Sequence, residues 1–119
     1  MIYVCSPYSH DDPAVREKRF DAACRAAAEL IRQGKTLFAP IVFSHPICRY
    51  GLPLDWRFWE RHHRRYLEAC DEVVVLMLDG WRESVGVQAE IAIARELGKP
   101  VSLLAPTGHA AENPGQGPG

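Results

Sequence analysis

Unbroken apolar runs mark the strands expected in this 119-residue chain. The clearest is DEVVVLML at 71–78, whose continuous apolar character is typical of a strand buried on both faces, as in a parallel sheet. IYVC at 2–5 predicts another buried strand, KTLFAP at 35–40 a short one, and KPVSLLAP at 99–106 a final one. Strand-like segments therefore recur along most of the chain.

Between these runs, apolar residues recur at helical spacing. Pro13 suits the first turn of a helix, where its missing N–H costs nothing, and Gly34 suits the end of that helix. Ser84 is a good N-cap for a later helix, and Gly98 closes it. The predicted helices span about 13–33, 56–70 and 84–98.

The stretch 41–56 interrupts this alternation. It contains prolines and a glycine and predicts a long loop, which in a compact domain is often functional. Residues 107–119 are rich in glycine and proline and predict a flexible C-terminal tail. The chain is therefore expected to form one domain over 1–106 followed by that tail.

Strands that alternate with helices indicate an α/β fold. We expect a three-layer α/β/α sandwich, Rossmann-like or flavodoxin-like, with a parallel sheet of four or five strands. In such sheets ligands bind beyond the carboxyl ends of the strands. Three segments should meet there: SPYS at 6–9, the predicted loop at 41–56, and DGWRES at 79–84.

Charge and hydropathy exclude several partners. The net charge is −1, and the short basic cluster at 61–65 is flanked by acidic residues, so no nucleic-acid polymer is expected. No apolar run approaches the ~20 residues that span a bilayer, so no membrane partner is expected. Met1 leads directly into a strand without a secretory signal, which predicts a cytoplasmic protein.

The four cysteines are widely and irregularly spaced, which favours separate thiols over disulfides. Two residue pairs have metal-ligand spacing, His45 with Cys48 and Glu60 with His63. Neither pair supplies the three or four ligands that a metal site needs, so no metal is expected.

Glu90 is a carboxylate among the apolar early residues of the helix after Ser84. A helix N-terminus offers unpaired backbone N–H groups that suit an anion, and Gly86 leaves space where a ligand would approach. A carboxylate placed there can attack an anomeric carbon and hold the sugar as an ester. These residues alone favour the simpler interpretation, in which Glu90 is a solvated helix residue and Gly86 a packing accommodation.

Aromatic side chains surround the start of the second predicted helix. Tyr50, Trp56 and Trp59 can stack on a nucleotide base or simply pack the loop onto the domain. Asp55 can hydrogen-bond a base or cap the helix.

Several motifs, in order, resemble the nucleoside 2-deoxyribosyltransferase superfamily, particularly its 2′-deoxynucleoside 5′-phosphate N-hydrolase branch. IYVCSPYS resembles the opening strand and loop of that family, and CDEVVVLML resembles its middle strand. The family motif S-x-G-x-x-x-E is followed by A-x-x-x-G-K-P-V. It is present here as Ser84, Gly86, Glu90, Ala94, Gly98, Lys99, Pro100 and Val101.

The resemblance covers about residues 1–105 and implies N-glycosidic bond hydrolysis, or 2-deoxyribosyl transfer, on a nucleoside or nucleoside 5′-monophosphate. It implies Glu90 as the nucleophile, no cofactor, and a homodimer or larger homo-oligomer. The substrate-binding residues expected are Ser6, Pro7, Tyr8, Ser9, Asp55, Trp56, Asp79, Gly80, Trp81, Ser84 and Gly86.

The sequence departs from that family at two places. The acidic residue eight places before the Asp of the middle strand is replaced by His63, which can donate a proton to the leaving base or be a solvated helix residue. The role can also fall to Asp55. The phosphate loop at 6–9 lacks an arginine, which leaves the 5′ group open. Two other functions remain open: a non-catalytic nucleotide-binding module, and hydrolysis of the N-glycosidic bond of NAD.

Overall fold

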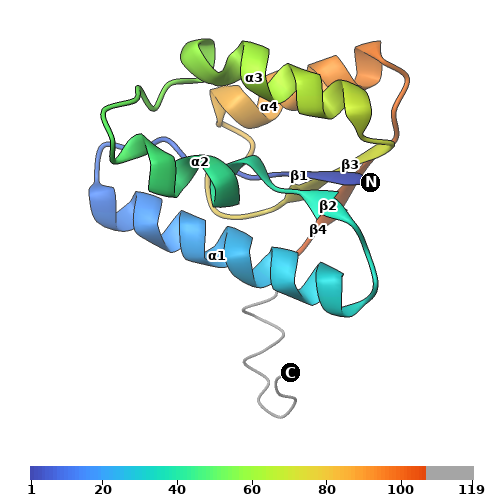
Figure 1. Cartoon of the computed structure of the whole chain (residues 1–119), viewed down its shortest axis with the longest axis horizontal. Coiled ribbons are helices and arrows are strands. Elements are labelled where there is room, and N and C mark those ends of the chain that lie inside the picture. The colour runs from blue at the N-terminus through green and yellow to red at the C-terminus, as the bar shows by residue number, and fades with distance from the viewer. Residues whose placement is uncertain (107–119) are drawn as a thin grey trace.

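The fold consists of alternating strands and helices, and the computed structural model describes residues 1–106 (Figure 1). The elements are β1 (Ile2–Cys5), α1 (Pro13–Arg32), β2 (Leu37–Phe38), α2 (Pro40–Cys48), α3 (Trp56–Ala69), β3 (Glu72–Leu76), α4 (Val85–Glu96) and β4 (Val101–Leu104). The tail predicted at 107–119 lies outside the described residues.

The four strands form one parallel sheet in the order β2-β1-β3-β4. The predicted parallel α/β sheet is therefore confirmed, with four strands. β1 and β3 pair along their length, from Ile2 opposite Glu72 to Cys5 opposite Val75. This order is that of a flavodoxin-like fold, and it places the topological switch point, where such folds bind ligands, between β1 and β3.

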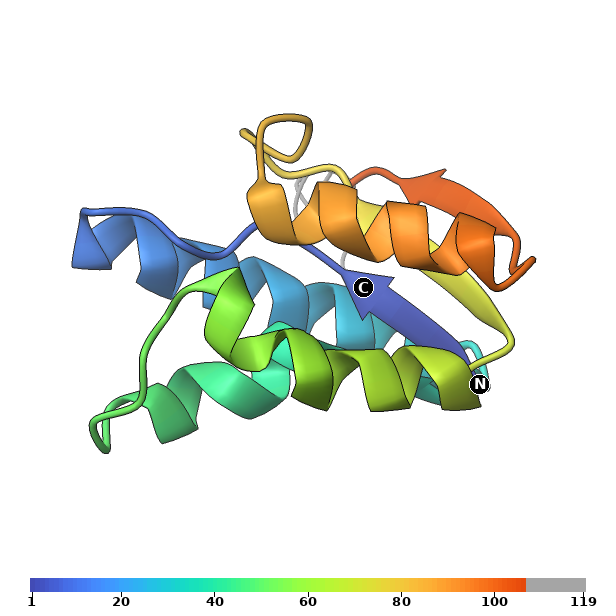
Figure 2. The same ribbon diagram turned by 90° about the horizontal axis from the view of Figure 1, so that it is seen from above.

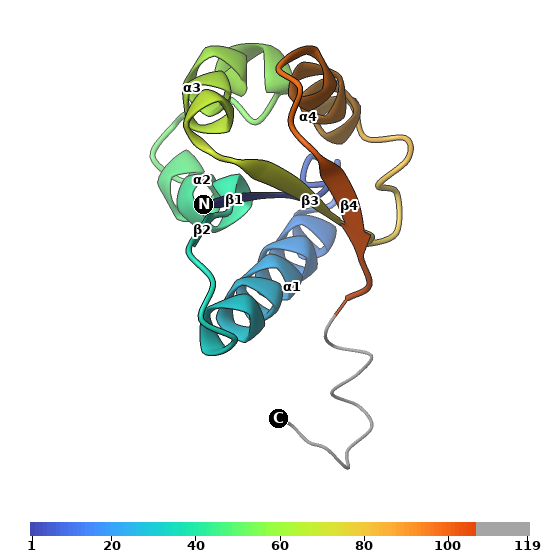
Figure 3. The same ribbon diagram turned by 90° about the vertical axis from the view of Figure 1, so that its right-hand side faces the viewer.

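Helices cover both faces of the sheet and complete the predicted three-layer sandwich. Figure 3 shows α1 on one face and α3 with α4 on the other, and Figure 2 shows α3 and α4 side by side. Alternate residues of β1 serve two cores: Val4 packs with Leu30 of α1, whereas Tyr3 and Cys5 pack with Leu67 of α3. Burial on both faces explains the apolar runs in the sequence.

The termini of α1 and α4 have the capping residues that the sequence predicts. The Ser84 hydroxyl accepts a hydrogen bond from the Val87 N–H at 3.2 Å, which confirms the predicted N-cap. Gly34 and Gly98 have φ values of 88° and 71° just past α1 and α4, in the left-handed region that favours glycine. Within residues 1–106, no helix combines the length and apolar character needed to cross a membrane.

The first half of the segment predicted as a loop at 41–56 is helical, so the prediction was wrong for residues 41–48, while residues 49–55 connect α2 to α3 without regular structure. Helix α2 begins at Pro40, a position that tolerates proline, and buries Ile41 and Ser44. Pro46 lies inside this helix. Ile41 and the partly buried Val42 pack into the cores on the α1 side of the sheet, whereas Phe43 is exposed. This packing outweighs the backbone hydrogen bond lost at Pro46.

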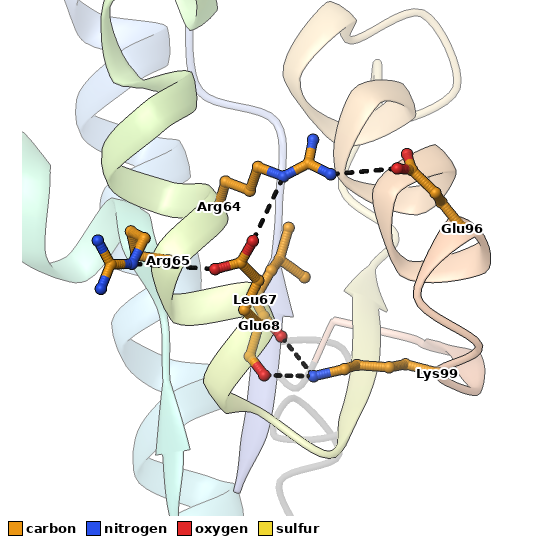
Figure 4. A network of polar contacts seen from close by, with 6 residues as sticks. All are labelled: Arg64, Arg65, Leu67, Glu68, Glu96 and Lys99. Carbon is orange, nitrogen blue, oxygen red and sulfur yellow. Dashed lines mark hydrogen bonds and ion pairs between the residues drawn. The ribbon is translucent and has the colours of Figure 1, made fainter.

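Lys99 joins the C-terminal end of α3 to the segment that leads into β4. Its Nζ donates to the backbone carbonyls of Leu67 at 2.9 Å and Glu68 at 2.6 Å, and also to that of Cys70. Figure 4 shows the first two contacts beside Arg64, which bridges α3 to Glu96 of α4. A cation at a helix C-terminus satisfies unpaired carbonyls and opposes the negative end of the helix dipole.

Replacing Lys99 by Met should lower the free energy of unfolding by about 1–3 kcal/mol, because three carbonyl groups lose a charged donor while the apolar stem is kept. Urea denaturation measures the change. Lys35→Met, at an exposed position, is the matched control and should stay close to the wild type. Equal stability of the two variants would show that Lys99 does not cap α3.

Candidate functional site

A cavity of about 530 Å³ lies at the carboxyl ends of the strands. Its walls come from the three segments that the sequence predicted to meet there, together with α2, α3 and α4. In Figure 1 these segments gather at the end of the sheet toward which β1 points. A concave site at the switch point of a parallel sheet is the usual place for a small-molecule ligand.

Ten of the predicted residues line this cavity: Ser6, Tyr8, Ser9, Asp55, Trp56, His63, Gly80, Ser84, Gly86 and Glu90. Among the described residues, Pro7, Asp79 and Trp81 do not form part of the lining. Pro7 is fully buried, Asp79 contributes a backbone carbonyl to Arg19, and Trp81 packs against the α3/α4 core. Neighbouring loop residues point in different directions, which the sequence alone does not reveal.

Glu90 is buried at 4% exposure, so the interpretation of a solvated helix residue was wrong. It belongs to the inward stripe of α4, which also contains Val87, Ile91 and Ala94. Its Oε2 accepts a hydrogen bond from the Tyr3 hydroxyl at 2.5 Å. Burial raises the pKa of Glu90 to about 8, and the hydrogen bond from Tyr3 opposes that rise only in part.

His63 is also buried, at 5% exposure, so the solvated interpretation fails for this residue too. It lies on the inward stripe of α3 between Trp59 and Leu67, and its ring stacks on Trp59 with centroids 5.4 Å apart. Its Nδ1 is 3.9 Å from Oε2 of Glu90. Within residues 1–106, neither ring nitrogen of His63 has a hydrogen-bond partner.

The pKa values of Glu90 and His63 are shifted in the opposite directions to those expected for a surface ion pair. Burial lowers the pKa of His63 to about 4, and the neighbouring His62 adds to this effect. Near neutral pH the carboxyl of Glu90 therefore keeps its proton and the imidazole of His63 lacks one. In these protonation states neither group is charged, so burial keeps the pair neutral rather than as an ion pair.

The other walls offer polar groups without committed partners. The Ser6 hydroxyl is buried and has no hydrogen-bond partner within the described part of the chain. Asp55 precedes α3 but, within residues 1–106, makes no capping hydrogen bond with its side chain. A Cβ added at Gly86 would meet Trp56 at 3.6 Å and the Ser84 hydroxyl at 4.0 Å, both in ordinary contact, so packing does not require this glycine.

Arg19, which no sequence motif indicated, reaches the cavity from α1. Its guanidinium donates to the carbonyl of Ser9 at 2.9 Å and to that of Asp79 at 3.1 Å, and so links the loops after β1 and β3. Desolvation lowers the pKa of Arg19. Arg19 lies in the second turn of α1, ten residues beyond Ser9, and no local motif reveals its position at the cavity.

Metal ligands do not gather at the cavity. Across residues 1–106, no three His, Cys, Asp or Glu side chains converge in a way that could hold an ion. His45 and Cys48, which have metal-ligand spacing in the sequence, bind different groups in the structure. His45 forms hydrogen bonds with Tyr8 and Glu17, and Cys48 donates to the carbonyl of Pro53. All four cysteines are free thiols.

The chain was compared with known proteins by sequence. No curated protein matches it. The family model described as "Domain of unknown function (DUF1937)" matches residues 1–106, which is the whole of the described α/β domain. The chain therefore belongs to the DUF1937 family.

Proposed function

We propose that this protein cleaves the N-glycosidic bond of a nucleoside or nucleoside 5′-monophosphate, by hydrolysis or by sugar transfer, with Glu90 as nucleophile. One observation carries the proposal: a fully buried carboxyl, bonded to Tyr3 and 3.9 Å from His63, lies in a ligand-sized cavity. A structural helix residue has no reason to be ionisable in such a place, because burial of the charged form is costly.

The cavity walls suit this class of substrate. Trp56 and Trp59 present aromatic surface on which a base can stack. Ser6 and Ser9 offer hydroxyl groups to a sugar. Arg19 adds a cation at the switch point, which favours a 5′-phosphate over an uncharged sugar end.

The first step of the proposed reaction is ionisation of the nucleophile. Glu90 transfers its proton to His63, the nearest base, and the carboxylate oxygen attacks C1′. The C1′–N bond breaks as the C1′–O bond forms, and its electron pair leaves with the base. Water or a second base then attacks C1′ and releases the carboxylate, with net retention. Tyr3 holds the oxygen in place, since its hydroxyl donates to Oε2.

Glu90→Gln should abolish base release and the covalent sugar adduct, because the amide keeps the Tyr3 hydrogen bond but cannot act as a nucleophile. Incubation with nucleosides, nucleoside 5′-monophosphates and NAD, followed by chromatography of free base and intact-protein mass spectrometry, measures both. Glu96→Gln, an exposed position on the same helix, is the control and should turn over normally.

Three results would redirect the proposal. Wild-type turnover by the Gln variant would leave Glu90 without a chemical role. Tight nucleotide binding without base release by the wild type would indicate a non-catalytic module. Release of nicotinamide from NAD alone would indicate the dinucleotide as substrate.

Glu90 should destabilise the protein increasingly as the pH rises. In the folded protein the pKa of Glu90 is about 8, above its ordinary value of 4.5. Between these two pH values the Glu90 carboxyl ionises only in the unfolded chain. The free energy of unfolding therefore falls as the pH rises from 4.5 to 8. A shift of this size corresponds to a loss on the order of 5 kcal/mol at most. Glu90→Gln should therefore match the wild-type Tm near pH 4.5 and exceed it at pH 8. A difference that does not change with pH would show that Glu90 is ionised when folded.

We also propose a homodimer or larger assembly. Val85, at 73% exposure, is an apolar side chain of the cavity lining that is open to solvent. A second subunit would cover such surface. Equilibrium sedimentation over a wide concentration range should show self-association, whereas a monomer at the highest concentration would contradict it.

A further inference from the structure

A chain of polar side chains runs from the surface to the cavity on the α1 and α2 side. The Tyr8 hydroxyl and Nδ1 of His45 are 2.6 Å apart, and Nε2 of His45 is 2.9 Å from Oε1 of Glu17. Tyr8 is buried at 8% exposure and lines the cavity, whereas Glu17 is exposed to solvent. The three residues come from the β1–α1 loop, α2 and α1.

The imidazole ring in the middle of this chain is held in one orientation. Phe20 stacks on His45 with ring centroids 4.3 Å apart and an interplanar angle of 29°. Tyr8 meets the same ring edge-on at 5.4 Å. With both nitrogens engaged and one face covered, the ring keeps its two hydrogen bonds aligned, as a proton relay requires.

The protonation state of His45 decides what the Tyr8 hydroxyl does. With one proton on the ring, the Tyr8 hydroxyl donates to Nδ1 and the Nε2–H donates to Glu17. With two protons, both N–H groups donate, and the Tyr8 oxygen becomes an acceptor from Nδ1–H. Its own hydrogen is then free to point into the cavity.

We propose that Tyr8 is the proton donor to the departing base, and that His45 and Glu17 act as positioning residues that reload it. The inference rests on the proposed function. Tyr8 packs with Ala23 and Ile41 in the core on the α1 and α2 side, whereas Glu90 bonds Tyr3, whose side chain belongs to the α3/α4 core. Donor and nucleophile thus approach the cavity from different layers of the sandwich.

This placement matches the geometry of a retaining displacement, in which nucleophile and leaving group lie on opposite sides of C1′. His63 is beside Glu90, on the nucleophile's side of the sugar. Its pKa of about 4 also leaves it without a proton of its own near neutral pH. Burial raises the pKa of Tyr8, which keeps the phenol protonated and available as a donor.

The step balances in atoms and charge. As the Glu90 oxygen bonds to C1′, the C1′–N electron pair moves to the base nitrogen, which takes the Tyr8 hydroxyl proton. The Tyr8 oxygen takes the Nδ1 proton of the His45 imidazolium, whose charge Glu17 compensates beforehand. In the second step water attacks C1′, and the proton it loses returns through Tyr8 to His45.

The test compares two leaving groups on one sugar. The first is the nucleoside or nucleotide that the wild type cleaves, and the second is the 4-nitrophenyl glycoside of the same sugar, whose leaving group departs without a proton. Tyr8→Phe should slow release of the natural base by about 10²–10⁴, the usual scale for general acid catalysis, while cleavage of the nitrophenyl glycoside stays near the wild-type rate. Glu17→Gln should also slow release of the natural base, by a smaller factor, and leave cleavage of the nitrophenyl glycoside near the wild-type rate. Tyr66→Phe, at a tyrosine outside the cavity lining, should change neither rate.

Equal slowing of both substrates by Tyr8→Phe would overturn the inference, because it would show that the phenol only supports the fold or binds the sugar. No slowing of either substrate would overturn it as well. Glu17 is exposed, so its Gln variant keeps the test decisive if Tyr8→Phe does not fold. The proposed function fails separately: then the wild type cleaves neither substrate, or Glu90→Gln still cleaves the nitrophenyl glycoside.

Discussion

The arrangement of the cavity depends on the hydrogen bond between Tyr3 and Glu90. Tyr3 is the second residue of a central strand and is fully buried, so its hydroxyl marks a fixed point above the sheet. α4 must place Glu90 within 2.5 Å of that point, which sets the rotation of the helix about its axis. Removing a carboxyl group from water costs free energy, and the hydrogen bond from Tyr3 compensates only part of that cost. The uncompensated part of that cost raises the pKa of Glu90. A shifted pKa is the property that a nucleophile or acid in a cleft needs.

Two further constraints keep the cavity walls in place around this contact. Arg19 binds carbonyl groups in both loops that flank the switch point, and the Trp59 indole donates to the carbonyl of Pro53 at 2.8 Å. Neither residue is in the loop that it holds. The loops are therefore fixed by side chains from helices, which gives these short connecting segments a defined conformation around the cavity.

The sequence predicted the strands, the Ser84 cap and the prominence of Glu90, because each leaves a local pattern of spacing or composition. The burial of Glu90 was also readable in principle, since Val87, Ile91 and Ala94 flank it at helical spacing. The contacts of Tyr8 with His45, and of His45 with Glu17, were not predictable. They join residues 37 and 28 positions apart, and nothing in the chain specifies that α2 forms where two prolines favour a loop. Local propensity failed there because tertiary burial decided the outcome.

The parallel pairing of β1 with β3 has a consequence for the order in which the molecule forms. Tyr3 and Glu90 are 87 positions apart, and they meet only after the chain between them has closed into a sheet. Such a long closure is slow compared with helix formation. During synthesis α4 can form while its carboxylate is still solvated and ordinary in acidity. Burial beneath the closed sheet raises the pKa of Glu90, so the unusual acidity of this residue belongs to the folded chain and not to the nascent one.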